Sequence, residues 1–204
     1  MNSTKPTHLG SPNKMIWEYF DCLRGMVRSV QDAQDPKNIQ QKVLPCVFMG
    51  ISIVETFLNI YFRILAEEAS CSSCREQTVK ELDENMSLNR KIKTWPKRFF
   101  DKEIDFGQGI GQRFMELKNL RNKLMHFKSS HEALPVEIPG LQIQGLANIS
   151  SYETLDNNVA QESLRIAEEM IEEIFRLKGM NADDIKGALH GWIGKVPFTE
   201  AMEK

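Results

Sequence analysis

The sequence predicts an all-α protein, an up-and-down helical bundle of about four to five main helices with a small irregular or β-hairpin insertion. Two observations indicate this class. Short β-like runs are confined to residues 127–152, and no internal repeat or sustained heptad pattern appears. Apolar residues recur at helical spacing through four long segments, residues 14–31, 38–68, 112–126 and 155–177.

The composition favours a folded protein with a single core. The chain has 204 residues, of which 41% are hydrophobic and 26% are charged. We expect a flexible polar leader over residues 1–13, with no secretory signal, followed by one helical domain over residues 14–204. Four cysteines do not make a disulfide framework in a chain of this size, so a cytoplasmic location is expected.

The first two helices are separated by a short interruption. Residues 14–31 form an amphipathic helix, and "DAQDPKN" ends it with a proline and residues suited to a turn. Residues 38–68 contain the most apolar run and are long enough to span a membrane. Polar side chains nevertheless recur along one side of this segment, at Ser52, Glu55, Asn59 and Arg63. Charged groups are costly in lipid, so we expect the central helix of a bundle and no membrane span.

The rest of the chain is predicted to form two further long helices and several shorter elements. Residues 69–98 hold short helical pieces, and the glycine-rich "DKEIDFGQGIGQ" reads as a flexible loop before a helix at about residues 112–126. The last long helix, at about residues 155–177, stops at Gly179 and allows an i,i+4 pair between Glu172 and Arg176. A short helix and an apolar tail follow, and we expect them to pack back onto the bundle.

Charge is distributed unevenly along the chain. Residues 86–131 carry 11 basic and 4 acidic side chains, whereas residues 132–204 carry 6 basic and 13 acidic ones. A polyanion would be attracted to the middle segment. The alternative is a basic helix face that lies against the acidic last helix.

The middle segment contains the stretch "LRNKLMHF", which holds Arg121, Asn122 and His126. On an ideal helix Asn122 and His126 lie about 40° apart, and Arg121 lies about 140° from His126. Histidine transfers protons near neutral pH, and arginine matches phosphate oxygens. These residue types therefore suit cleavage of an RNA phosphodiester. The alternative is that Arg121 and His126 only stabilise the negative end of the helix dipole.

The stretch "LRNKLMHF", together with the central "ISIVETFLNIYF", resembles the HEPN superfamily (higher eukaryotes and prokaryotes nucleotide-binding). Catalytic members share an arginine, a polar residue directly after it, and a histidine a few residues on, which Arg121, Asn122 and His126 match. The resemblance spans about residues 15–178. One departure is Lys128, which stands where a subgroup neutralised by a nucleotidyltransferase antitoxin has a tyrosine.

The resemblance implies a metal-independent endoribonuclease of the toxin or antiviral-defence type, without a cofactor. It would act as a homodimer with its active site at the interface, attack through the RNA 2'-OH, and leave 2',3'-cyclic phosphate and 5'-OH ends. An antitoxin or regulatory protein is a possible partner. The alternative is a non-catalytic helical module that binds nucleotide, RNA or a partner protein.

Supporting roles follow for other polar residues. Glu55 and Asn59 also match the second helix of many family members. Glu55 is expected to hold Arg121 in place. The alternative is that the two residues form a buried polar pair that only orients neighbouring helices. Basic side chains are expected to bind RNA, whereas Trp95 among them is expected to lie in the core. These basic candidates are Arg90, Lys91, Lys93, Lys97, Arg98, Lys118 and Lys123.

Two further motifs favour no cofactor site. Cys71 and Cys74 make one Cys-x-x-Cys, which is half of a zinc ligand set, and no second pair with ligand spacing occurs. The stretch "GQGIG" lacks the lysine and hydroxyl residue of a phosphate-binding P-loop. We therefore expect neither a metal nor a nucleotide cofactor.

Overall fold

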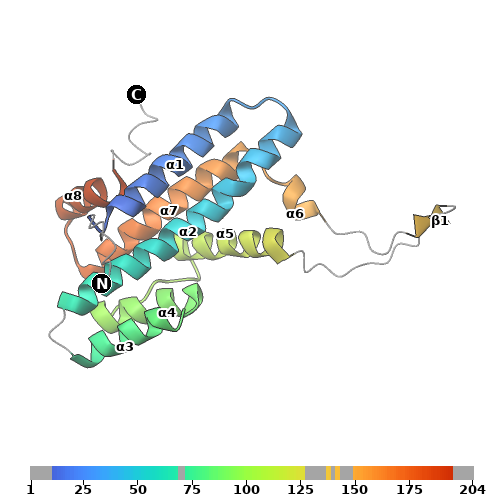
Figure 1. Cartoon of the computed structure of the whole chain (residues 1–204). Coiled ribbons are helices and arrows are strands. Elements are labelled where there is room, and N and C mark those ends of the chain that lie inside the picture. Colours follow the sequence, from blue (N-terminus) through green and yellow to red (C-terminus); the bar gives the residue numbers. More distant parts are fainter. Residues whose placement is uncertain (1–10, 69–71, 127–136, 139–140, 143–148, 195–204) are drawn as a thin grey trace, which may run out of the picture. The chain divides into compact units, whose positions relative to one another are not determined.

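The computed structural model describes residues 11–68, 72–126, 137–138, 141–142 and 149–194, and it is all-α, as predicted. Within these ranges the chain forms eight helices and one pair of two-residue strands (Figure 1). The helices are α1 (Lys14–Gln31), α2 (Pro36–Glu68), α3 (Ser72–Asp83), α4 (Leu88–Phe100), α5 (Gly109–His126), α6 (Ser150–Glu153), α7 (Asn157–Lys178) and α8 (Ala182–Ile193).

The contacts divide the chain into two compact units. The first unit comprises residues 1–22, 55–103 and 171–204, and the second comprises residues 23–54 and 104–170. Helices α1, α2 and α7 contribute residues to both units. The expectation of a single domain over residues 14–204 stays a prediction.

The second unit contains the end of α1, the beginning of α2, the beginning of α7 and all of α5. Lys42 of α2 donates to the Ser29 carbonyl of α1 at 3.0 Å, and Arg24 of α1 pairs with Glu168 of α7 at 3.0 Å. A Cβ built on Gly50 of α2 would lie 2.8 Å from the Ser163 carbonyl oxygen of α7, so glycine permits a close helix contact there. These contacts join α1, α2 and α7 within the second unit.

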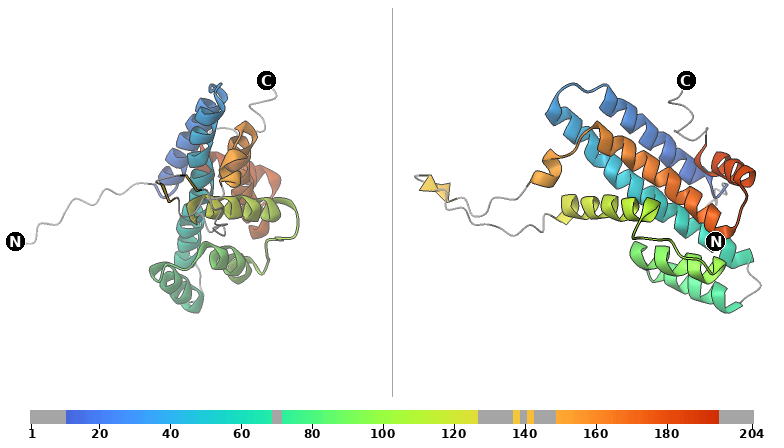
Figure 2. Two further views of the ribbon diagram at one scale, coloured as in Figure 1. Left: turned by 90° about the vertical axis from the view of Figure 1, so that its right-hand side faces the viewer. Right: turned by 180° about the vertical axis from the view of Figure 1, so that it is seen from behind.

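The first unit is built around aromatic side chains. Phe57 of α2 stacks on Tyr61 with ring centroids 5.0 Å apart, and both rings meet Phe175 of α7 and Trp192 of α8 edge to face. Phe62 of α2 faces the side chains of α4. Figure 2 shows from two directions that α3 and α4 lie beside each other. Such rings bury large apolar areas and make this region the core of the unit.

Several boundaries agree with the sequence patterns. Helix α1 begins and ends as predicted, and α7 ends at Lys178 before Gly179, whose φ of +88° is readily adopted by glycine. The predicted pair between Glu172 and Arg176 forms. Helix α8 follows with Asn181 as its N-cap, since the Asn181 side chain accepts a bond from the Asp184 N–H at 2.9 Å.

The prediction of a flexible loop up to residue 111 is wrong at its end, because α5 already begins at Gly109. Gly109 has a φ of +61°, and a Cβ on Gly111 would lie 2.2 Å from the Asp105 carbonyl oxygen. Asp105 also accepts bonds from the Gly107 N–H and the Gln108 side chain, both at 2.8 Å. The glycines therefore permit a tight entry into the helix.

Two further predictions concern the insertion within residues 127–152 and the membrane. Strands β1 (Glu137–Ile138) and β2 (Leu141–Gln142) pair antiparallel, as expected for a hairpin within residues 127–152. Helix α2 is long and apolar enough to cross a membrane by length and composition, and 50% of its most apolar window is buried in the structure.

Residues 1–10 of the predicted leader lie outside the described residues. At the end of that leader, the Asn13 side chain donates to the Gly191 carbonyl of α8.

Candidate functional site

Helix α5 carries the three residues that the sequence singles out. Phe114, Leu117 and Leu124 are buried and attach the helix to its unit. Arg121 and Asn122 are half-buried, and both lie between the buried residues Leu117 and Leu124. The two polar side chains therefore stand on a helix that apolar packing holds in place.

Arg121 is not neutralised by a carboxylate of the described residues. Its Nη1 donates to the Sδ of Met125 at 3.3 Å, and no Asp or Glu in the described ranges forms an ion pair with it. Six of the other arginines pair with a glutamate, namely Arg24, Arg63, Arg98, Arg113, Arg165 and Arg176. Like Arg121, Arg28, Arg75 and Arg90 form no ion pair with a described residue. The guanidinium group of Arg121 keeps most of its donors available to an anion.

His126 is the last residue of α5, one turn after Asn122. The backbone thus places these two residues on the same face of the helix, as the spacing predicted. The side chain of His126 lies outside the described part of the structure, as do Lys128 and His131.

Glu55 and Asn59 of α2 belong to the first unit. Glu55 accepts a bond from the ammonium group of Lys91 at 3.1 Å. Arg121 belongs to the second unit, so the suggested pairing of Glu55 with Arg121 stays a prediction. The Oδ1 atom of Asn59 is buried and has no hydrogen-bond partner among the described residues. Their assignment to an active site stays a prediction.

Three of the seven basic candidates are poorly placed to bind RNA. Lys91 is 4% exposed and paired with Glu55, and Lys118 is 8% exposed. The Arg98 side chain is 14% exposed and forms an ion pair with Glu81 at 2.7 Å. A phosphate at the surface would not reach these groups without rearrangement, so burial argues against Lys91, Lys118 and Arg98 as part of an RNA surface.

The other four basic candidates are exposed. Arg90, Lys93 and Lys97 project from α4, and Lys123 projects from α5. Lys97 pairs with Glu103, which raises the pKa of the Lys97 ammonium group, chiefly through the hydrogen bond from Lys97 to that carboxylate. Within the first unit, the candidate RNA surface is therefore the exposed side of α4.

A buried polar cluster around Glu81 was not predicted. Trp95 is fully buried, as expected, and its Nε1 donates to Glu81 Oε2 at 2.8 Å. Arg98 and Gln77 also donate to this carboxylate. Burial acts to raise the pKa of Glu81, but the hydrogen bonds from Arg98 and Trp95 outweigh it and leave the pKa lowered. The cluster ties α3 to α4, and no local pattern in the sequence marks it.

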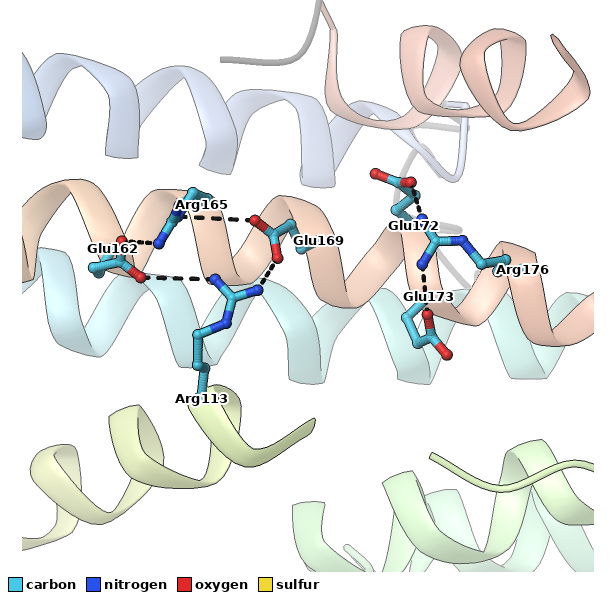
Figure 3. A network of polar contacts seen from close by, with 7 residues as sticks. All are labelled: Arg113, Glu162, Arg165, Glu169, Glu172, Glu173 and Arg176. Atoms are coloured by element: carbon cyan, nitrogen blue, oxygen red, sulfur yellow. Dashed lines mark hydrogen bonds and ion pairs between the residues drawn. The ribbon is translucent and has the colours of Figure 1, made fainter. Parts of the chain in front are cut away.

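Part of the basic segment does lie against the acidic last helix. Arg113 of α5 pairs with Glu169 and with Glu162 of α7, and Arg165 bridges the same two glutamates (Figure 3). For Arg113, the uneven charge along the chain therefore reflects basic and acidic helices that pair with each other. This explanation does not apply to Arg121, which has no such pair among the described residues.

No group of three or more His, Cys, Asp or Glu side chains in the described ranges is placed to hold a metal ion. Cys74 lies in the first turn of α3, and Cys71 lies outside the described ranges.

The structure defines an all-α helical protein in which Arg121, Asn122 and His126 lie in the last two turns of α5. Comparison with protein-family models, with curated proteins and with solved structures finds no match to this chain.

Proposed function

We propose that this protein is a metal-independent endoribonuclease of the HEPN type, with Arg121, Asn122 and His126 as its catalytic residues. The observation that carries the proposal is the state of Arg121. It is half-buried on a well-anchored helix, one turn before the end, and no described carboxylate neutralises it. A cation held in this way is suited to binding a phosphate.

The chemistry follows from the residue types. In RNA the 2'-OH attacks the adjacent phosphorus, so that the O2'–P bond forms while the P–O5' bond breaks. His126 would accept the 2'-OH proton as a base or give a proton to the departing 5' oxygen as an acid. Arg121 would stabilise the charge that develops on the phosphorane oxygens, and Asn122 would orient the phosphate or the imidazole.

A homodimer completes the proposal. One chain supplies one histidine at this position, whereas the reaction needs both a base and an acid. Two copies related by a two-fold axis would bring two clusters into one cleft. The exposed side of α4 and Lys123 would attract the RNA backbone by charge.

The test is cleavage of RNA by the purified protein in the presence of a metal chelator. We expect cleavage with 2',3'-cyclic phosphate and 5'-OH ends. We expect His126→Ala to lower the rate by roughly 10²–10⁴-fold, the range for loss of a general acid or base. The matched control is His190→Ala, because His190 is an exposed histidine of α8.

Circular dichroism and light scattering would check that both variants keep the fold and the oligomeric state. If the wild type, freed of any bound partner, cuts no RNA, or if His126→Ala and His190→Ala cleave equally, the protein is not this nuclease. RNA or nucleotide binding without cleavage would instead favour a non-catalytic module.

A further inference from the structure

The first unit contains a hollow with a volume of about 810 Å³ that no role above explains. It lies between the start of α1, the second half of α2 and Leu82 of α3, and all of its lining residues belong to the first unit. The volume falls within the range of about 300–1,000 Å³ that is typical of small-molecule sites. We call it the α1–α2 hollow.

Apolar side chains form much of its wall. Met15 is 50% exposed, and it lines the hollow together with Ile60, Ile64 and Leu82. A ligand with apolar side chains would remove this surface from water, which is favourable. The wall therefore favours an apolar ligand body.

A polar group interrupts that wall. Asn59 lines the hollow, and its buried Oδ1 has no hydrogen-bond partner among the described residues. A buried acceptor without a donor is costly, and native structures rarely leave one. A ligand N–H group near Asn59 would supply the missing donor.

The charged residues at the hollow are balanced. Lys14 and Arg63 are basic, whereas Glu18 and Glu67 are acidic. Arg63 pairs with Glu67 at 3.3 Å. Lys14 and Glu18 lie one turn apart on α1, and neither forms an ion pair with a described residue. One unpaired charge of each sign favours a ligand that carries both an anionic and a cationic group.

We propose that the α1–α2 hollow binds a short zwitterionic peptide with apolar side chains. Its carboxylate would face Lys14, its ammonium group would face Glu18, its side chains would cover Met15 and Ile64, and a peptide N–H would bond to Asn59. This proposal does not depend on ribonuclease activity, since the hollow contains none of Arg121, Asn122 and His126.

The test is a titration of the full chain, labelled with ¹³C at its methionine methyl groups, with the free dipeptide leucyl-phenylalanine. Met15 and Met125 are each 50% exposed, so Met125 is a matched control outside the hollow. We expect a saturable shift of the Met15 methyl resonance and no saturable shift of the Met125 resonance. Met15→Leu and Met125→Leu would assign the two signals.

Two variants of the lining residues, one control variant and one modified ligand make the test specific. Glu18→Gln and Asn59→Leu should each weaken binding roughly tenfold or more, while Glu76→Gln on α3 should leave it unchanged, because Glu76 lies outside this hollow. The dipeptide capped at both ends should bind more weakly than the free one. No saturable shift up to about 10 mM ligand, equal shifts at both methionines, or equal affinity for the capped peptide would overturn the proposal.

Discussion

Arg98 and Glu81 form two parallel hydrogen bonds, from Nη1 to Oε2 at 2.8 Å and from Nη2 to Oε1 at 2.7 Å. Both side chains are largely buried, at 14% and 11% exposure. The two-bond geometry joins α4 to α3 and suits the planar fork of arginine.

Removal of one partner of this pair should be strongly destabilising, because it leaves the other charge buried and unpaired. We expect Arg98→Ala to lower the free energy of unfolding by about 3 kcal/mol. The matched control is Arg176→Ala, which removes an arginine that is 58% exposed and pairs with Glu172 and Glu173. Surface pairs contribute about 0–1 kcal/mol, so urea unfolding should separate the two variants clearly.

The same carboxylate should make stability depend on pH. The folded-state pKa of Glu81 is lowered from its ordinary value of 4.5, so its contribution to stability is present above that value and is lost as the pH falls through the lowered pKa. The difference in unfolding free energy between wild type and Glu81→Gln should be largest at neutral pH and should shrink in acid. Urea unfolding from pH 7 to pH 3 would measure it, and a constant difference would contradict the assignment.

Two glycines of the second unit should respond oppositely to alanine. A Cβ on Gly50 would lie 2.8 Å from the Ser163 carbonyl oxygen, whereas a Cβ on Gly25 of α1 would meet nothing within 4 Å. Gly50→Ala should therefore destabilise the protein by about 1–3 kcal/mol through overpacking. Gly25→Ala should stabilise it by about 0.5–1 kcal/mol, since alanine loses less backbone entropy in a helix. Thermal unfolding would show melting temperatures that move in opposite directions.

Substitution of Arg90 should affect RNA binding, whereas substitution of its neighbour Lys91 should affect stability. Arg90 is exposed, whereas Lys91 is buried against Glu55. Arg90→Ala should weaken RNA binding and reduce the salt dependence of the affinity by about one charge, without loss of stability. Lys91→Met should reduce stability, because it leaves Glu55 without its partner. Fluorescence anisotropy at several salt concentrations, beside urea unfolding, would decide whether the exposed side of α4 contacts RNA.

A substitution can test whether catalysis needs the planar guanidinium group of Arg121 or only its positive charge. Arg121→Lys keeps a positive charge but loses the planar fork. RNA binding should therefore be nearly unchanged, while cleavage should fall by roughly 10²-fold, the loss seen when one transition-state donor is removed. Equal single-turnover rates for wild type and Arg121→Lys would show that the fork is not used in the reaction.

Much of the fold could be predicted because it depends on local patterns. Apolar spacing located α1 at its observed bounds, and Gly179 marked the end of α7. The helical spacing of Asn122 and His126 likewise follows from the backbone alone. The start of α5 was missed, because Gly107, Gly109 and Gly111 resemble a loop, and the close approach of Gly111 to the carbonyl of Asp105 is seen only in the structure.

The sequence by itself determined the fold class, the approximate bounds of the four long helices and the candidate residues of α5, since each of these depends on neighbours within a few turns of helix. Only the tertiary structure decided which charges are neutralised. Lys91 forms an ion pair with Glu55, which lies 36 residues away in the sequence, while Arg121 forms none with a described carboxylate. The physical reason is that burial and ion pairing depend on side chains from other helices, and helical periodicity cannot distinguish a basic residue with such a partner from one without.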